Sequence, residues 1–147
     1  MNQTTQKFFH ELSQVFGKLE DFPPPQFVSD LEMSVLEYTS GESIKVTFPI
    51  YEKYNNPMGS TFGGYFGMFF DAAFGPFSGL STKAATTSLD LNVSFIKGLS
   101  TADKEVIVKV EVVNQSRSFL IMEAKAYKTD GTLVATATTR MFIIKLK

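Results

Sequence analysis

The most informative feature of this sequence is what it lacks. The 147 residues include no cysteine and no tryptophan, and only one histidine, His10. The absence of cysteine excludes disulfide bonds, cysteine nucleophiles and thiolate metal sites. A histidine-based catalytic or metal site would have to use His10, which stands in a polar, helix-like stretch and is expected to be a solvated surface residue. Carboxylates, hydroxyls, amides and backbone donors must therefore supply any chemistry.

The chain also lacks an excess of charge of either sign. Its formal net charge is -1 at pH 7 and it has no block of lysine and arginine, so we expect no nucleic-acid partner and no membrane partner. No apolar run reaches the about 18 residues that a membrane span needs. The N-terminus lacks the apolar core of a signal peptide. A cytoplasmic location is the simplest expectation, and the absence of cysteine fits a reducing compartment.

Length and composition indicate one domain. A chain of 147 residues with 44% hydrophobic and 20% charged residues is typical of a soluble globular protein. We expect residues 1–147 to form a single domain, with residues 1–25 as an N-terminal helix and a proline-rich connection. Apolar side chains recur at helical spacing over residues 5–20, with Thr4 or Thr5 as the expected cap. This helix is expected to pack on the body of the domain.

Six runs are predicted to be strands because polar and apolar residues alternate along them. Ser40-Gly41-Glu42 and Thr129-Asp130-Gly131-Thr132 are typical of hairpin turns. The six predicted strands are residues 33–39, 43–49, 86–96, 105–114, 118–128 and 133–144.

Residues 61–80 are the unusual segment, because they are too long for a strand and apolar on all sides. This pattern predicts a buried helix. Its glycines cost ~1 kcal/mol each relative to alanine, which indicates that the backbone closely approaches something. Pro76 is expected to kink or end the helix. We therefore predict the α+β class: a curved antiparallel sheet wrapped around one long buried helix, with an extra N-terminal helix.

Asp71 is the only charged residue in this predicted helix. It is either solvated at an exposed position, or a carboxylate held in a cleft as base or nucleophile. We favour the second interpretation, because apolar neighbours would raise its pKa. Gly63-Gly64, where the loop enters the helix, provides either close packing or backbone N–H groups for an anion or oxyanion. Asn56 is a turn residue or a side-chain donor.

The spacing of these residues resembles that of a known family. Residues 56–64 read Asn-Pro-Met-Gly-Ser-Thr-Phe-Gly-Gly, and Asp71 follows eight positions after Gly63. Hotdog-fold thioesterases of the PaaI and 4-hydroxybenzoyl-CoA thioesterase type are similar: an Asn, a Gly, His-Gly-Gly, and an acidic residue eight positions after the first glycine of that pair. Residues 87–95 and 116–137 also resemble the family, and the resemblance spans roughly residues 30–145.

The resemblance implies the hotdog fold and hydrolysis of an acyl-CoA or a related thioester. We expect no cofactor and no metal ion, because the sequence offers no ligand set beyond scattered carboxylates. The resemblance assigns Asp71 as general base or nucleophile and the N–H of Gly63 as oxyanion donor. It places Asn56 near the attacking water or the carboxylate. The residues that it implies for substrate binding are Phe62, Gly64, Ser88, Ser116 and Arg117.

Phe62 departs from the family pattern, because it stands where the family has histidine. A backbone N–H survives this change, but a side-chain donor is lost. The alternative function is therefore a non-catalytic hotdog module that binds acyl-CoA or a fatty-acyl group. A hotdog dehydratase is disfavoured, since such sites resemble a His-Asp or His-Glu pair and only His10 is available.

The strand predicted at residues 86–96 indicates an assembly of several copies. Leu89, Leu91, Val93 and Phe95 are expected to give it one apolar face, and a long edge strand of this kind needs covering. Pairing with a second copy about a two-fold axis would cover it. We therefore expect a homodimer or a dimer of dimers. In the related family the site forms across that dimer, which would place Asn56 and Gly63 opposite Asp71 of the other chain.

Overall fold

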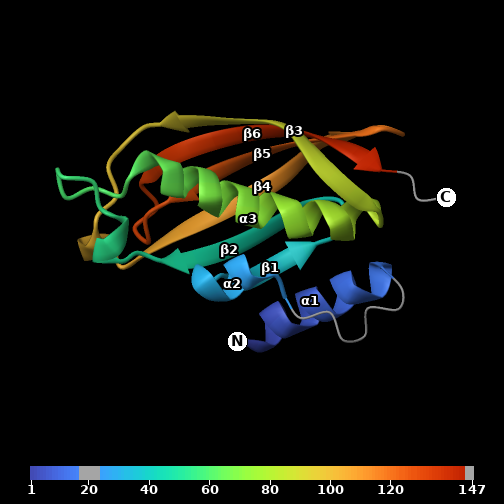
Figure 1. The fold of residues 1–147 in the computed structure, drawn as a ribbon, viewed down its shortest axis with the longest axis horizontal. Helices are drawn as coiled ribbons and strands as arrows, with labels where there is room; N and C mark the ends of the chain where they lie inside the picture. The colour runs from blue at the N-terminus through green and yellow to red at the C-terminus, as the bar shows by residue number, and fades with distance from the viewer. Residues whose placement is uncertain (17–23, 145–147) are drawn as a thin grey trace.

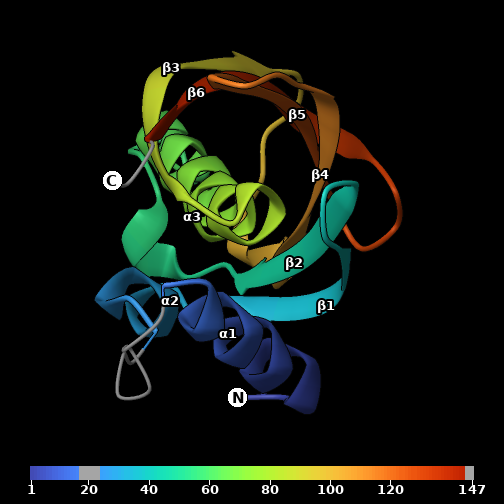
Figure 2. The same ribbon diagram turned by 90° about the vertical axis from the view of Figure 1, so that its right-hand side faces the viewer.

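The computed structural model describes residues 1–16 and 24–144 of the chain. Six strands form one antiparallel sheet in the order β1-β2-β4-β5-β6-β3, and the sheet curls around the long helix α3 (Gly63–Thr82) (Figures 1 and 2). The hotdog architecture predicted from the sequence is confirmed. The strands are β1 (Ser34–Thr39), β2 (Ser43–Pro49), β3 (Ala85–Phe95), β4 (Glu105–Gln115), β5 (Phe119–Tyr127) and β6 (Leu133–Ile144).

Each predicted strand boundary agrees with the observed one within one residue. The pattern is clearest where a strand has one face in the core and one in solvent. Along β5 the burial alternates, with every second residue from Leu120 to Ala126 buried. The two predicted hairpins are also present: Gly41 and Gly131 close them with φ values of +76° and +90°, a backbone region that favours glycine. β3 stands at the edge of the sheet, as predicted.

Aromatic side chains attach α3 to the concave face of the sheet. Phe69, Phe70, Phe74 and Phe77 are at most 1% exposed, and the ring of Phe69 stacks on that of Phe48 in β2 at 4.8 Å between centroids. Burying side chains of this size contributes about 1.5–3 kcal/mol each. The helix therefore forms although it contains several glycines.

Pro76 was expected to kink or end the helix, and it does not end it, because α3 continues to Thr82. A proline inside a helix costs about 3 kcal/mol. The buried side chains of Phe74, Phe77 and Leu80 on both sides of it offset that cost. The helix ends at Lys83, whose φ of +54° is left-handed.

The N-terminal helix α1 (Gln3–Val15) packs against β1, as Figure 2 shows, and it also contacts α3. Residues 17–20 of the helix predicted over 5–20 lie outside the described residues. Phe8 is fully buried, and Leu12 lies so close to Gly79 of α3 that an added Cβ there would be 3.1 Å from its Cδ1. The glycine thus permits the close contact of two helices. Three short helices complete the fold: α2 (Gln26–Asp30), η1 (Glu52–Tyr54) and η2 (Thr101–Asp103).

The cap of α1 differs from the prediction and joins the helix to the sheet. Asn2, not Thr4 or Thr5, is the N-cap, and its Oδ1 accepts the N–H of Thr5 at 2.7 Å. The Thr5 hydroxyl donates to the same oxygen and accepts the N–H of Val35 in β1 at 2.8 Å. A buried side chain thereby satisfies a backbone donor on the outer edge of the sheet, which explains why Thr5 is fully buried.

No helix within the described ranges combines the length and apolar character needed to cross a bilayer.

Replacing Thr5 should destabilise the fold through this bond. Thr5→Val keeps the shape but leaves the N–H of Val35 without an acceptor, which costs about 1–3 kcal/mol. Thr4→Val, one position earlier on the same helix and partly exposed, is the matched control and should change stability by less than about 0.5 kcal/mol. Urea unfolding of both variants measures the difference. Equal midpoints for the two would contradict the assigned role of Thr5.

Candidate functional site

One flank of α3 is left uncovered by the sheet and by α1. Gly64, Met68 and Asp71 are exposed there, and Gly75 is partly exposed. These positions recur every three to four residues and so lie on one face of the helix. α2 lies on one side of this face and β3 on the other (Figures 1 and 2). We call the resulting depression the α3 groove; its floor is Met68, Asp71, Ala72, Gly75 and Gly79.

Asp71 lies at the wall of a 170 Å³ hollow in this groove. The other lining residues are Phe27, Leu31, Met68 and Ala72, all apolar. Although the carboxylate is exposed in one copy of the chain, burial beside these neighbours raises its pKa above the ordinary 3.8. Desolvation disfavours the charged form, which is the cause of the shift. Asp71 is thus a carboxylate of increased basicity at an accessible position.

A second hollow of 330 Å³ continues along the groove toward the end of α3. Phe27 lines both hollows, and Ser88 of β3 lines the second. Gly75 forms part of its floor, and among the described residues nothing beyond the helix's own backbone lies within 4 Å of where a Cβ on Gly75 would stand. Apart from Ser88 and Thr86, the described lining residues are Leu12, Phe16, Pro25, Phe27, Gly75, Pro76, Gly79, Ala84, Ala85 and Met141. The hollow is suited to an apolar group.

The start of α3 presents backbone donors. Phe62 is the N-cap and makes no side-chain capping bond. The N–H groups of Gly63 and Gly64 have no acceptor among the backbone hydrogen bonds of the described residues. They belong to the first turn of the helix, whose N–H groups are unpaired within the helix and carry the positive end of its dipole. This helix start can therefore bind an anion or a developing oxyanion.

Asn56 organises the loop that leads to this helix. Its Oδ1 accepts the N–H groups of Met58 (2.9 Å) and Ser60 (3.2 Å), so the oxygen has a turn role. Asn56 and Gly63 line the same 340 Å³ hollow. The structure therefore brings these two residues to one hollow within a single chain.

Thr61 also lines this hollow and was not identified from the sequence. It is 6% exposed, and its Oγ1 has no hydrogen-bond partner among the described residues. A buried hydroxyl without a partner is unfavourable by about 1–3 kcal/mol. Thr61 and Gly63 line the same hollow. The sequence placed Thr61 at the start of the segment 61–80 that was predicted to be a buried helix, and gave no indication that its hydroxyl would lack a partner.

Phe62, the residue that replaces the family histidine, is 57% exposed. Its ring lies over the first turn of α3: an added Cβ at Gly64 would be 3.0 Å from its Cε1. On the other side of the turn, Phe95 approaches Gly63 in the same way, at 3.1 Å. Two rings thus flank the free N–H groups, and the two glycines leave space for them.

The predicted site residues fall into separate places within one chain. Asp71 follows Gly63 by eight residues, which is about 12 Å along a helix that rises 1.5 Å per residue. Ser116 and Arg117 lie in the connection between β4 and β5, where the Ser116 Oγ accepts the N–H of Phe119 at 3.2 Å. They line none of the three hollows described above.

His10 is exposed on α1, where its ring is hydrogen-bonded to Gln14 at 3.1 Å. The expectation of a surface histidine is confirmed. Within residues 1–16 and 24–144, no three histidine or acidic side chains gather closely enough to hold a metal ion.

β3 presents a free edge beside the α3 groove, because it pairs only with β6. Leu91, Val93 and Phe95 occupy alternate positions along it, and Phe95 is 61% exposed. The predicted alternation is wrong at Leu89, where the register shifts between Ser88 and Asp90. The extra residue is a β-bulge, which breaks the period of two.

Asp90 holds the bulge in place. Its carboxylate accepts the backbone N–H of Arg140 at 2.9 Å and the Arg140 Nε at 2.7 Å. The hydrogen bonds from the side chain and backbone of Arg140 lower the pKa of Asp90 below its ordinary value.

Known structures share this architecture at low sequence identity, which shows the fold alone. AziG of S. sahachiroi is 13% identical, with a TM-score of 0.79 over 84% of this chain and all of that one. PaaI of E. coli is 14% identical, with a TM-score of 0.77 over 92% of this chain and 95% of that one. The smu.793 protein of Streptococcus mutans, solved bound to acetyl CoA, is 21% identical, with a TM-score of 0.71 over 78% of this chain and 90% of that one.

No curated protein matches the chain significantly in sequence. The sequence model of the thioesterase superfamily, however, matches residues 58–135, from the loop before α3 into β6. This segment is more than half of the chain and carries both the start of α3 and Asp71. The chain therefore belongs to the thioesterase superfamily.

Proposed function

We propose that this protein hydrolyses an acyl-CoA or a related thioester, with Asp71 as the general base or nucleophile and the N–H of Gly63 as oxyanion donor. The observation that carries the proposal is the placement of Asp71: one carboxylate, with a raised pKa, on the uncovered face of an otherwise apolar helix. Perturbed carboxylates in clefts are frequent in active sites. The acetyl CoA bound by the Streptococcus mutans neighbour supports a CoA thioester as substrate.

A complete site requires two copies of the chain in this proposal. Gly63 and Asp71 are about 12 Å apart along one helix, which is too far for both to act on one carbonyl carbon. A second copy with α3 antiparallel to the first, crossing near Gly67, would bring Gly63 of one chain beside Asp71 of the other. Gly67 lies midway between the two, and nothing in the described part of the chain, apart from the helix's own backbone, stands within 4 Å of where its Cβ would be. The free edge of β3 offers the accompanying strand pairing.

The proposed reaction uses a water molecule and the two polar elements. The N–H of Gly63 stabilises the negative charge that develops on the carbonyl oxygen. Asp71 accepts a proton as the water oxygen bonds to the carbonyl carbon. The C–S bond then breaks, the proton passes to the departing thiolate, and the products are a carboxylic acid and a thiol. If Asp71 instead attacks directly, water hydrolyses the resulting anhydride.

The α3 groove would hold the acyl group. The 330 Å³ hollow beyond Asp71 is lined almost entirely by apolar residues, and apolar burial favours a hydrocarbon substituent over a charged one. Gly75 keeps this space open at a helix position where alanine would be more stable by about 1 kcal/mol. We therefore propose an apolar acyl group as the preferred substrate class.

Phe62 favours a second candidate function, acyl-CoA binding without turnover. Its side chain makes no capping hydrogen bond and offers no donor at the start of α3. Binding of an acyl-CoA with no release of thiol, by both the parent and Phe62→His, would support this alternative. Faster turnover by Phe62→His would instead indicate that the missing donor limits an enzyme.

Removing the basicity of Asp71 should abolish turnover. Asp71→Asn preserves size and hydrogen bonding but cannot accept a proton, so kcat should fall at least about 100-fold. Thiol release from a panel of acyl-CoAs measures this. Asp30→Asn, an exposed carboxylate on α2, is the matched control and should retain parental kcat. Parental turnover by Asp71→Asn would overturn the mechanism.

Mixing two inactive variants tests whether the site spans two chains. Gly63→Pro removes the proposed oxyanion donor at a helix position that tolerates proline, and it should lower kcat about 10²–10³-fold. Refolded together with Asp71→Asn, it should recover about a quarter of the parental rate, because half of the dimers are mixed and each contains one complete site. Activity no greater than the sum of the separate variants would place the site within one chain.

The direction of the Asp71 pKa shift can be tested. ¹³C NMR titration should place Asp71 above 3.8 and Asp130 below it, because hydrogen bonds from the side chain and N–H of Thr132 lower the pKa of Asp130. A raised folded-state pKa means that the contribution of Asp71 to stability is lost as pH rises through that pKa. Asp71→Asn should therefore be at least as stable as the parent at pH 7. A lower Tm for this variant, or an Asp71 pKa at or below 3.8, would contradict the environment described for it.

Filling the open space at Gly75 should change the acyl-group preference. The series Gly75→Ala, Gly75→Val and Gly75→Leu places progressively larger side chains in the 330 Å³ hollow. The kcat/KM for long-chain acyl-CoA should fall stepwise, while that for acetyl-CoA, the internal control, stays near the parental value. Parallel losses for both substrates would show that the hollow does not hold the acyl chain.

A further inference from the structure

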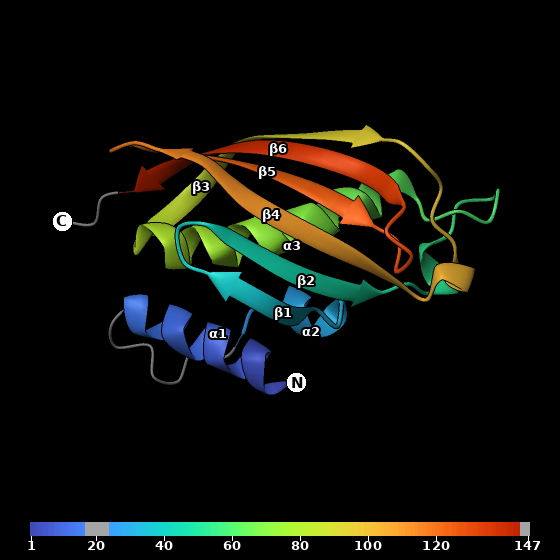
Figure 3. The same cartoon turned by 180° about the vertical axis from the view of Figure 1, so that it is seen from behind.

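A pair of hydroxyl groups lies at the end of the α3 groove, at the hollow of 330 Å³. The Ser78 Oγ of α3 is 2.6 Å from the Thr86 Oγ1 of β3. Figure 3 shows from behind how β3 begins beside the end of α3. Ser78 is fully buried, whereas Thr86 is partly exposed and lines the hollow. A group bound in the hollow would therefore meet this pair at Thr86.

The positions of the two protons follow from the hydrogen bonds of Ser78. Its Oγ is also 2.6 Å from the carbonyl oxygen of Gly75, and a carbonyl oxygen can only accept. A serine hydroxyl has one proton, so Ser78 donates it to Gly75 and accepts the proton of Thr86. The Thr86 oxygen then has lone pairs but no proton left to donate. Among the described residues it makes no other hydrogen bond.

Thr86 is thus an acceptor in a wall that is otherwise almost entirely apolar. An acceptor that is desolvated without a donor is unfavourable, so a wholly apolar ligand leaves it unpaired. A ketone oxygen would face it with no proton between the two oxygens. A charged ammonium group could donate, but it would lose too much hydration in an apolar hollow. The group that fits best is a neutral hydroxyl on an otherwise apolar ligand.

Ser88, the next residue of β3 that lines the hollow, does not have this selectivity. It makes no hydrogen bond with its side chain among the described residues, so its hydroxyl can donate or accept as the ligand requires. The discrimination between a donor and an acceptor on the ligand therefore depends on Thr86, because only the Thr86 proton is already engaged.

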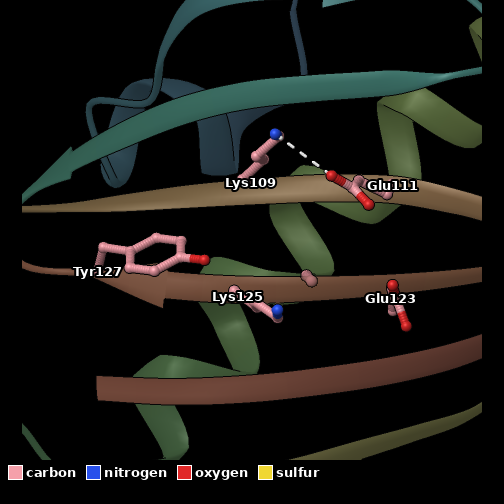
Figure 4. Close-up of a pocket in the computed structure, with 6 residues that line it drawn as sticks. Lys109, Glu111, Glu123, Lys125 and Tyr127 are labelled. Atoms are coloured by element: carbon pink, nitrogen blue, oxygen red, sulfur yellow. Dashed lines mark ion pairs between the residues drawn. The ribbon is translucent and has the colours of Figure 1, made fainter. Parts of the chain in front are cut away.

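The hollow on the outer face of the sheet offers no comparable site. Its volume is about 80 Å³, and the charged residues Lys109, Glu111, Glu123 and Lys125 line most of it (Figure 4). Charged side chains at the surface remain hydrated and do not favour an apolar ligand. The hollow at Thr86 is larger and combines an apolar wall with one oriented acceptor.

The Thr86 acceptor is far from the proposed reaction centre. Ser78 follows Asp71 by seven residues, which is about 10 Å along the helix. A thioester with its carbonyl group beside Asp71 would therefore bring to Thr86 a substituent near the remote end of its acyl group. A hydroxyl close to the thioester would not reach it.

We propose that Thr86 is a specificity-determining residue, which selects acyl groups that carry a neutral hydroxyl at the end remote from the thioester. This inference rests on the proposed thioesterase function and adds to it the polarity and position of one substituent. The Thr86 oxygen accepts the proton of the substrate hydroxyl. Ser78 acts through Thr86 as a positioning residue, because it engages the Thr86 proton and leaves only lone pairs toward the hollow.

Substrates that differ only in this substituent test the proposal. Octanoyl-CoA has no polar group on its chain, 7-hydroxyoctanoyl-CoA has a donor, and 7-oxooctanoyl-CoA has an acceptor of the same size. In the parent, kcat/KM for the hydroxyacyl substrate should exceed that for the oxoacyl substrate by about two- to tenfold, the range of one neutral hydrogen bond. The corresponding hexanoyl and decanoyl sets cover other chain lengths. The hydroxyl of 3-hydroxyoctanoyl-CoA lies near the thioester and should give no advantage over octanoyl-CoA.

Variants of the hydroxyl pair connect this preference to the two residues. Thr86→Val keeps the shape but removes the acceptor, so the preference for the hydroxyacyl substrate should disappear, whereas Thr86→Ser should retain it. Ser78→Ala releases the Thr86 proton, which can then be donated to a ketone, so the ratio should shift toward 7-oxooctanoyl-CoA. Thr87→Val, at the next and exposed position of β3, is the matched control and should keep the parental ratio.

The outcomes separate this proposal from the proposed function. Turnover in the parent with equal kcat/KM for hydroxyacyl and oxoacyl substrates at every chain length, or a parental ratio in Thr86→Val, would overturn the role of Thr86 and leave the thioesterase function standing. If the parent releases no thiol, titration calorimetry gives the Kd of the same thioesters, and the same ratios in Kd would support Thr86 while contradicting turnover. Binding of none of them would overturn both. Circular dichroism verifies the fold of each variant, and the comparison of substrates in the parent requires no variant.

Discussion

The structure depends on one constraint: α3 is apolar around its whole circumference, and a single curved sheet can cover only part of it. The concave face of the sheet takes the phenylalanine side, where Phe69, Phe74 and their neighbours are buried. α1 covers a further part of the α3 surface, where Leu12 lies close to Gly79. What remains is the stripe that contains Asp71. The candidate site is therefore the part of the helix that the fold cannot cover with its own elements.

The glycines of α3 divide into two groups within this constraint. At Gly63, Gly64 and Gly79, side chains of the same chain occupy the space that a Cβ would fill. At Gly67 and Gly75 nothing of the described chain does so. The first group lets aromatic and aliphatic side chains approach the helix axis. Gly67 and Gly75 lower the stability of the helix, and no contact among the described residues compensates for this loss. Such glycines are expected where a ligand or another copy approaches the backbone.

Sequence reasoning predicted the features that depend on local pattern. The alternation of β5, the hairpins at Gly41 and Gly131 and the all-round apolar character of α3 each follow from a period or a turn residue, so their positions were predictable. Asp71 could be identified because a single charge in an apolar helix is conspicuous. The family resemblance added the proposal that Asp71 acts together with Gly63, which no periodicity indicates.

The features that sequence reasoning missed depend on contacts between distant residues. Asn2 caps α1 because the neighbouring Thr5 is bonded to the edge of β1, a contact over about 30 positions. The burial of the Thr61 hydroxyl is decided by the packing around its loop. Pro76 is tolerated within α3 because burial of the side chains around it offsets the free-energy cost of proline inside a helix. The register shift at Leu89 depends on Arg140, fifty positions after Asp90.

The Asp90–Arg140 contact also has a consequence for folding. A strand at the edge of a sheet has one neighbour to define its register, and a slip by one residue turns every side chain to the opposite face. On β3 such a slip would direct Leu91, Val93 and Phe95 outward. The carboxylate of Asp90 binds one backbone N–H and one guanidinium of a single residue, and both bonds are lost in any other register. Each chain can therefore fix the register of its exposed edge strand β3 before it meets another molecule. Association then joins surfaces that are already formed, and no alternative register of β3 competes.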